Sequence, residues 1–206
     1  MKRINLSLAF LFSLALLSNS SCTICSCKTV DCPAFNDPVL DQWITAMEND
    51  TLVFKNAFSA TDTLVVGKIQ RSAATQVTKG CMHSATGCDA WLLLFDAQAA
   101  GIKFSLTFES FTGWDNQTST QFAISFKDLT IKGTGVTDTG FVTSAAGIQT
   151  LFRSAISLNG KNFANVQLIS ADSTGRTAGI TKLYFARNIG VIAYETYPAS
   201  ELWVRQ

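Results

Sequence analysis

Residues 154–170, SAISLNGKNFANVQLIS, decide the fold class of this chain. Two runs of strand-forming residues flank the dipeptide Asn159-Gly160. Asn and Gly tolerate the positive φ that a two-residue hairpin turn requires, so this pattern is a strong hairpin signal. We therefore predict two antiparallel strands that are joined at Asn159-Gly160.

Similar runs occupy much of the chain on both sides of this hairpin. Short apolar or alternating segments are separated by turn residues, as in TLVFKNAF (51–58), TDTLVVGKIQ (61–70), IKFSLTFESF (102–111), QFAISFKDLTIKG (121–133), ITKLYFARNIGVIAYETY (180–197) and ELWVRQ (201–206). The pattern predicts roughly eight to ten strands and no helix after residue 50. Because short turns join antiparallel strands, we expect a mainly β fold: a single antiparallel sandwich, a barrel or a strongly curved sheet.

Two segments carry finer expectations. The alternation of apolar and polar residues slips at Lys127-Asp128, which predicts a β-bulge or a bend there. Residues 133–140, GTGVTDTG, are typical of an exposed loop.

One short N-terminal helix is predicted at the start of the β-rich region. Asp37 suits the N-cap and Pro38 suits the first helical position. The apolar residues that follow share one face at helical spacing: Val39, Leu40, Trp43, Ile44 and Met47. We expect this face to dock on the core.

The chain begins with the features of a secretory signal peptide, which we assign to residues 1–21. Lys2 and Arg3 precede an apolar run of about a dozen residues, which is too short to span a bilayer. Small residues then lead into Cys22. This order resembles the lipobox of bacterial lipoproteins, in which a cysteine thiol is acylated and the cysteine becomes the mature N-terminus.

Cys22 is therefore the predicted site of lipid attachment. Asn19 stands where the lipobox usually has leucine, so Cys27 is the alternative site. A plain secreted protein with a disulfide-rich N-terminus is a further alternative. Residues 22–36 then form a lipid-anchored, cysteine-rich tether. Its remaining cysteines, Cys25, Cys27 and Cys32, suit local disulfides or unpaired thiols, with a thiophilic metal as the alternative.

Two later cysteines enclose a short segment, CMHSATGC, between Cys81 and Cys88. A disulfide between them is the economical reading in an oxidising compartment. The alternative is a metal held by both thiols and His83, the only histidine in the chain. We predict the Cys81–Cys88 disulfide, with no metal and no cofactor.

Composition and charge limit the partners of the remaining residues, 37–206, which we assign to a single β-rich domain. Removal of Lys2 and Arg3 with the signal peptide lowers the net charge from +1 to −1, since residues 1–21 contain no acid. No basic patch appears, so we expect no nucleic-acid partner.

Catalytic motifs are absent from the sequence. There is no G-x-S-x-G, no H-E-x-x-H and no Walker-type loop. The four glutamates suit solvated strand or turn positions better than a catalytic carboxylate pair: Glu48, Glu109, Glu195 and Glu201. We therefore predict that the chain is not an enzyme.

Aromatic residues are numerous in the β-rich region. We assign most of them to the core, and the alternative for the others is a groove for a hydrophobic ligand. The candidates are Trp91, Phe95, Phe104, Phe108, Phe111, Phe122, Phe126, Phe141, Phe152 and Phe163.

Both ends of the chain resemble uncharacterised lipoproteins of Bacteroidetes-type bacteria. The resemblance lies in SCTICSCKTVDCPAFNDPVLDQWI (21–44) and in LYFARNIGVIAYETYPASELWVRQ (183–206), with an aromatic strand, a Gly190 turn and a last strand containing Trp203. It implies no assigned activity. In such bacteria, acidic residues after the lipidated cysteine accompany surface export, and their lack here implies the periplasmic face of the outer membrane. The Gly190 stretch also resembles the last strands of periplasmic lipoprotein and lipid carriers with a curved-sheet fold.

We therefore expect a lipid-anchored, non-catalytic protein of the cell envelope. It acts as an interaction or structural module, with the membrane and an envelope protein as partners. The alternative is a periplasmic carrier or sensor of a hydrophobic ligand. A large aromatic-lined cavity favours the carrier, whereas a filled core with exposed apolar surface favours the module.

Overall fold

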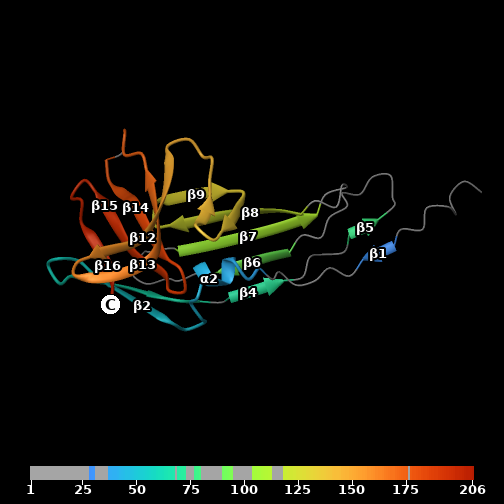
Figure 1. The fold of residues 1–206 in the computed structure, drawn as a ribbon, viewed down its shortest axis with the longest axis horizontal. Helices are drawn as coiled ribbons and strands as arrows, with labels where there is room; N and C mark the ends of the chain where they lie inside the picture. The colour runs from blue at the N-terminus through green and yellow to red at the C-terminus, as the bar shows by residue number, and fades with distance from the viewer. Residues whose placement is uncertain are drawn as a thin grey trace, which may run out of the picture.

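The computed structural model describes residues 28–30, 37–67, 69–72, 77–79, 90–94, 104–112, 118–175 and 177–206. Over these ranges the chain is mainly β, with sixteen strands and one short helix, α2 (Figure 1). The prediction of a mainly β fold is confirmed. The predicted number of strands is too low, because several strands are only three to five residues long.

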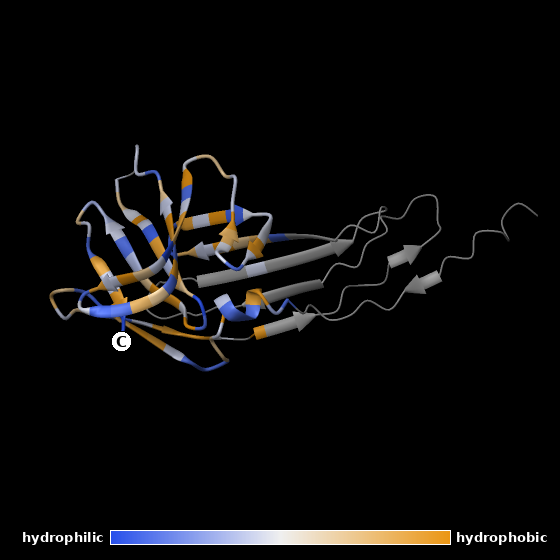
Figure 2. Cartoon of the chain, viewed as in Figure 1, coloured by the Kyte–Doolittle hydropathy of each residue, from blue (hydrophilic) through white to orange (hydrophobic). Residues whose placement is uncertain are grey.

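Seven strands form the larger antiparallel sheet. Their order is β12-β13-β14-β15-β16-β2-β3. The bounds are β12 Ile148–Leu158, β13 Lys161–Ala171, β14 Gly179–Ala186, β15 Gly190–Tyr197, β16 Leu202–Arg205, β2 Thr51–Lys55 and β3 Thr61–Val65. Hydrophobic and hydrophilic residues alternate along several of these strands (Figure 2).

Five strands form the second large sheet, in the order β4-β6-β7-β8-β9. The bounds are β4 Ile69–Ser72, β6 Ala90–Leu94, β7 Phe104–Thr112, β8 Thr118–Phe126 and β9 Leu129–Gly133. Two small pairs complete the described strands. β1 (Lys28–Val30), which lies within the predicted tether, pairs with β5 (Val77–Lys79), and β10 (Gly135–Thr137) pairs with β11 (Gly140–Val142).

The hairpin predicted from residues 154–170 is confirmed. β12 and β13 pair antiparallel, with Leu158 opposite Lys161. Asn159 has φ 47° and Gly160 has φ 77°, so both central residues have the positive φ of a type I′ turn.

The main core lies between the two large sheets. Both contribute to one apolar cluster, so they pack face to face. Its buried members are Leu40, Trp43, Leu52, Phe54, Leu64, Val66, Phe122, Ile124, Phe126, Leu129, Ile131, Phe141, Ile169, Ile180, Leu183, Phe185, Val191 and Tyr194.

A second apolar cluster covers the other side of β14–β16. In β13, Phe163 and Val166 both belong to it although they are three residues apart, so the strand changes face between them. Asn165 has φ 52° and marks this bend. The end of the β12–β13 hairpin therefore folds toward β16, where Lys161 Nζ donates to the Arg205 carbonyl at 3.0 Å.

The predicted helix is shorter than its apolar pattern indicated. α2 spans only Leu40–Trp43, because Ile44 adopts an extended conformation. Asp37 does serve as a cap: its Oδ1 accepts from the backbone N–H groups of Val39 and Leu40 at 2.9 and 3.1 Å. Met47 lies beyond the helix and is 69% exposed, so its assignment to the docked face was wrong.

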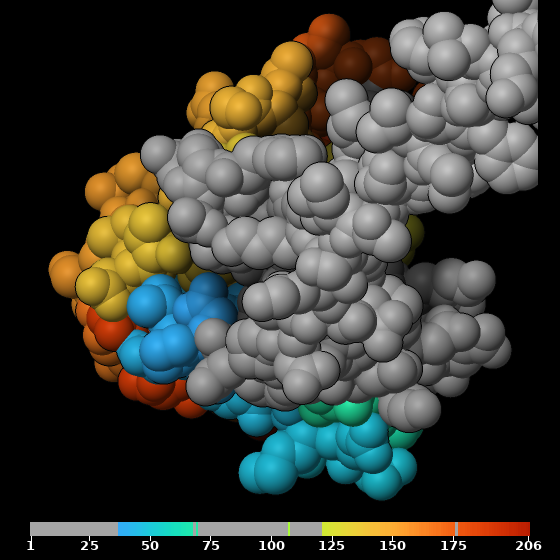
Figure 3. Space-filling model, turned by 90° about the vertical axis from the view of Figure 1, so that its right-hand side faces the viewer, coloured from blue at the N-terminus to red at the C-terminus, as the bar shows by residue number. Residues whose placement is uncertain are grey.

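α2 closes one end of the main core. Leu40 and Trp43 are fully buried, and Trp43 Nε1 donates to the Thr137 carbonyl at 3.0 Å. Figure 3 shows the blue residues of this segment against the yellow residues that follow β8. No helix in the described ranges is long and apolar enough to cross a bilayer.

Two finer expectations are corrected. Lys127-Asp128 forms neither a bulge nor a bend within a strand, but the turn of the β8–β9 hairpin, with Phe126 opposite Leu129. Lys127 takes φ 54°, the positive value that the first central residue of a type II′ turn requires. Residues 133–140 are not a plain loop, because they contain β10 and the start of β11.

Candidate functional site

The cysteines that carried the sequence predictions lie outside the described residues. This holds for the lipid-attachment candidates Cys22 and Cys27 and for the disulfide candidates Cys81 and Cys88. It holds also for Cys25, Cys32 and His83, the residues of the two alternative metal sites. All of these assignments remain predictions.

The glutamates make separate structural contacts. Glu48 Oε1 accepts from the Ile69 N–H at 2.8 Å. Glu195 forms an ion pair with Lys182 across β14 and β15, with an N–O distance of 2.9 Å. Glu201 accepts from Thr196 through its backbone carbonyl, at 3.0 Å.

Carboxylates and thiols do not gather into a metal site in the described part of the chain. No group there contains three or more His, Cys, Asp or Glu side chains placed to hold an ion. Glu109, the remaining glutamate, lies in β7, and its side chain lies outside the described part.

The candidate aromatic residues lie in the core wherever their side chains are described. Phe122, Phe126 and Phe141 are at most 3% exposed, and Phe152 packs against the same cluster. Phe163 packs against the second cluster. Of the others, Trp91, Phe104, Phe108 and Phe111 lie in strands described by their backbone alone, and Phe95 lies outside the described residues.

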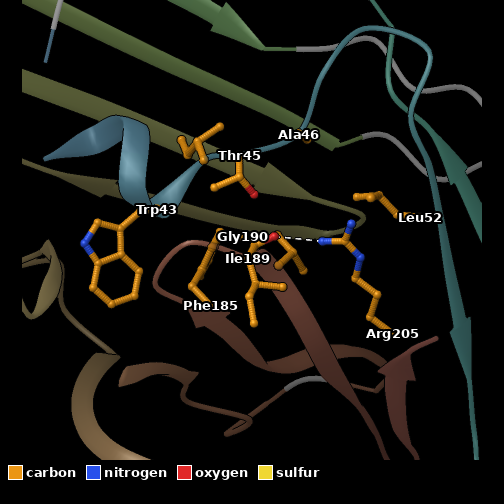
Figure 4. Close-up of a pocket in the computed structure, with 10 residues that line it drawn as sticks. Trp43, Thr45, Ala46, Leu52, Phe185, Ile189, Gly190 and Arg205 are labelled. Carbon is orange, nitrogen blue, oxygen red and sulfur yellow. Dashed lines mark hydrogen bonds between the residues drawn. The ribbon is translucent and has the colours of Figure 1, made fainter. Parts of the chain in front are cut away.

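One small apolar cavity lies beneath α2, at the Gly190 turn (Figure 4). Its volume is about 20 Å³, which is room for about one water molecule. Arg205 closes it by donating from Nη1 to the Ile189 carbonyl at 2.8 Å, and burial lowers the pKa of this guanidinium. The cavity is too small for a lipid.

A larger hollow, of about 220 Å³, lies on the five-stranded sheet. Its lining mixes polar and apolar side chains and comes from β7, β8 and β9: Thr107, Gln121, Phe122, Ala123, Lys132 and Gly133. A Cβ at Gly133 would lie 2.4 Å from the Phe122 ring, so glycine permits the close approach of strand and ring. Three of its six lining residues are polar or charged, Thr107, Gln121 and Lys132, whereas a lipid site is lined mainly by apolar side chains.

A polar cluster joins the two large sheets. Asp62 in β3 accepts from Lys127 Nζ at 3.0 Å, and Lys127 belongs to the β8–β9 turn. The Tyr194 hydroxyl, from β15, donates to the same Asp62 carboxylate. Lys127 Nζ also lies 4.6 Å from the centre of the Tyr194 ring.

This cluster is suited to holding structure and not to acid–base chemistry. Burial, and then the hydrogen bond to Asp62, raise the pKa of Tyr194, so its phenol stays protonated. Trp203 stacks on the Tyr194 ring with 5.8 Å between centroids, which fixes the ring further. No sequence signal could reveal the cluster, because Asp62 and Tyr194 are 132 residues apart.

One sheet edge in the described part, the outer edge of β12, is long and mostly exposed. This strand ends the seven-stranded sheet and, among the described strands, has a hydrogen-bonded neighbour on one side only, β13. Its residues 149–151 and 153–155 are exposed, and Leu151 is 44% exposed. Sequence reasoning found the strand but could not find the edge, since strand order depends on which distant segments pair.

Unpaired backbone donors and acceptors along such an edge can hydrogen-bond to an additional strand. The arrangement is thus chemically suited to binding a polypeptide. Comparison of the chain with family models, curated proteins and solved structures finds no match.

Proposed function

We propose that this chain is a lipid-anchored, non-catalytic interaction module of the cell envelope, held at the periplasmic face of the outer membrane. The observation that carries the proposal is the eleven-residue strand β12, whose outer edge has no strand neighbour among the described residues. An extended segment of another polypeptide can add to such an edge through main-chain hydrogen bonds. Cys22 supplies the anchor in this proposal.

The carrier alternative has less support. A carrier needs an apolar cavity of several hundred Å³. Among the described residues, the cavity beneath α2 holds about 20 Å³, and the hollow of about 220 Å³ has polar as well as apolar side chains in its lining. The described candidate aromatic side chains lie mainly in the core.

The test is photo-crosslinking in intact cells that produce the full chain. A photoreactive phenylalanine derivative replaces Leu151 on β12 and, as the control, Phe58, which lies in the β2–β3 turn and is 81% exposed. A light-dependent protein adduct at position 151, absent at position 58, supports the module. Equal labelling at both positions, or no adduct at 151, contradicts it.

A further inference from the structure

We propose that β12 pairs antiparallel with β12 of a second copy of this chain and joins two seven-stranded sheets across a twofold axis. The proposal rests on the proposed function and deepens it, because it names the partner of the open edge. Three features support it. No described strand pairs with the outer edge of β12, the strand has no proline and one charge, and the order of its side chains is self-complementary.

No described strand pairs with the outer edge of β12. In an antiparallel sheet, the N–H and C=O groups of alternate residues point to each side of a strand. β13 takes one side of β12 at ten paired positions. Among the described residues, the one further backbone bond of β12 lies at the start of the strand, from Ile148 N–H to the Ala145 carbonyl at 3.2 Å.

β12 also lacks most of the features that prevent edge pairing. Natural edge strands are commonly short or carry proline or several charges. β12 has eleven residues, IQTLFRSAISL, with no proline and with Arg153 as its single charge. The bend beside Ser154 limits the straight part of the edge but leaves the residues before it open.

The side chains suit self-pairing about one residue, Phe152. An antiparallel twofold axis through Phe152 places the two Phe152 residues opposite each other. Thr150 then faces Ser154 of the second copy, and Leu151 faces Arg153. The aromatic rings and the two small hydroxyl residues meet their own kind, Leu151 faces the aliphatic stem of Arg153, and no like charges oppose.

Neighbouring registers suit the edge less well. An axis through Arg153 places two guanidinium groups directly opposite each other, which is destabilising. An axis through Leu151 pairs Thr150 with Phe152 and loses the aromatic pair. The order of residues therefore favours the axis through Phe152.

A pairing of about five residues is short for a stable dimer in free solution. The proposed lipid anchor changes this balance, because two copies held in one membrane meet at a high effective concentration. Self-pairing is therefore expected at the membrane and at high protein concentration in detergent.

The register gives a charge test at Leu151. In the proposed dimer, Leu151→Glu places a carboxylate opposite Arg153 of the second copy, twice per dimer, whereas Leu151→Lys places two cations opposite each other. We expect the dissociation constant to fall roughly tenfold for Leu151→Glu relative to wild type and to rise roughly tenfold for Leu151→Lys. An axis through Leu151 would give the opposite result for Leu151→Glu, because the two introduced carboxylates would then face each other.

The measurement is sedimentation of the purified mature chain in density-matched detergent over a range of concentrations. Val65→Glu and Val65→Lys are the matched controls, because Val65 lies on β3, the opposite edge strand, and is 42% exposed. Circular dichroism melting confirms that each variant is folded. The pairing is supported if the dissociation constant of the dimer changes in opposite directions for Leu151→Glu and Leu151→Lys and does not change for the Val65 variants. Monomers throughout, or equal shifts for Glu and Lys, overturn it.

The in-cell crosslink at position 151 separates this inference from the proposed function. An adduct of twice the chain mass supports both. An adduct with a different protein supports the interaction module and overturns self-pairing. No adduct overturns both.

Discussion

The side-chain amide of Gln167 exchanges two hydrogen bonds with the backbone of Phe141, each 2.7 Å long. The Phe141 N–H donates to Gln167 Oε1, and Gln167 Nε2 donates to the Phe141 carbonyl. Gln167 is 3% exposed and Phe141 is 1% exposed, so water does not replace these bonds freely. The amide thus takes the place of a neighbouring strand and ties β11 to β13.

Replacement of Gln167 by leucine should therefore destabilise the fold. The substitution leaves the Phe141 N–H and carbonyl buried without this partner, at a cost of about 2–4 kcal/mol. Urea denaturation of Gln167→Leu measures it, with Gln121→Leu as the control, because Gln121 is an exposed glutamine on β8. Equal stability of the two variants would show that the paired amide is dispensable.

The contact between Asp62 and Tyr194 should couple β3 and β15 of the seven-stranded sheet energetically. Tyr194→Phe removes the hydroxyl but keeps a ring for Trp203 to stack on, and Asp62→Asn removes the charge. We expect a coupling energy of about 1–2 kcal/mol in a double-mutant cycle measured by chemical denaturation. Tyr197→Phe, at a 36% exposed residue, is the control and should show no coupling to Asp62→Asn. If the losses of unfolding free energy in Asp62→Asn and Tyr194→Phe simply add in the double variant, the two side chains do not stabilise each other.

Local chemistry explains what the sequence predicted correctly. Asn159-Gly160 and the strand pattern of residues 180–197 depend on residues close together in the chain, and both form the expected hairpins. Asp37 likewise caps α2 through neighbouring N–H groups.

The sequence predictions are wrong or incomplete where a local pattern fits two structures or where contacts between distant residues determine the structure. Lys127-Asp128 lacks the Gly or Asn that usually marks a tight turn, so the change of face alone predicts a bulge or a bend. The Asp128 side chain accepts from the Ile180 N–H at 2.9 Å, a contact that no local pattern reveals. The Gln167–Phe141 pair and the β12 edge are equally beyond local pattern, because both depend on sheet order.

Alkaline pH should weaken the fold through Tyr184. Burial, and then the nearby Glu195 charge, raise the pKa of this phenol to about 12, from an ordinary value near 10. Between these values the unfolded chain loses the proton while the folded chain keeps it. The free energy of unfolding is therefore unaffected by Tyr184 below about pH 10 and falls above it, by up to about 1.4 kcal/mol per pH unit.

Urea titrations check this effect at a series of pH values from about 8 to about 12. This range includes both the ordinary pKa of tyrosine and the raised pKa of Tyr184. Tyr184→Phe should remove part of the slope above pH 10. Tyr194 contributes in the same direction, so some slope remains in Tyr184→Phe. An unchanged slope in Tyr184→Phe would exclude Tyr184 as a source.

The predicted Cys81–Cys88 disulfide has a direct chemical test. In the protein purified from an oxidising compartment, iodoacetamide should leave both cysteines unmodified until a reductant is added. Cys81→Ser and Cys88→Ser should each lower the free energy of unfolding by about 2–3 kcal/mol, because the bond restricts the unfolded chain. Modification of both thiols without reductant would exclude the bond.

The lipid anchor is tested by metabolic labelling with an alkyne-bearing palmitate. Wild-type chain should carry the label and sediment with membranes, because acyl chains on Cys22 partition into the bilayer. Cys22→Ala should lose both properties. Cys32→Ala is the control, since it removes a cysteine of the same segment that neither reading assigns to the anchor, and it should retain the label.

Cys27→Ala distinguishes the two candidate anchor sites. If Cys22 is the anchor, Cys27→Ala keeps its label, and the mature chain begins at residue 22 in N-terminal peptide mass spectrometry. Loss of label in Cys27→Ala with retention in Cys22→Ala would move the anchor five residues along the chain. A wild-type chain without any label would support the plain secreted protein. It would also remove the membrane concentration on which self-pairing of β12 depends.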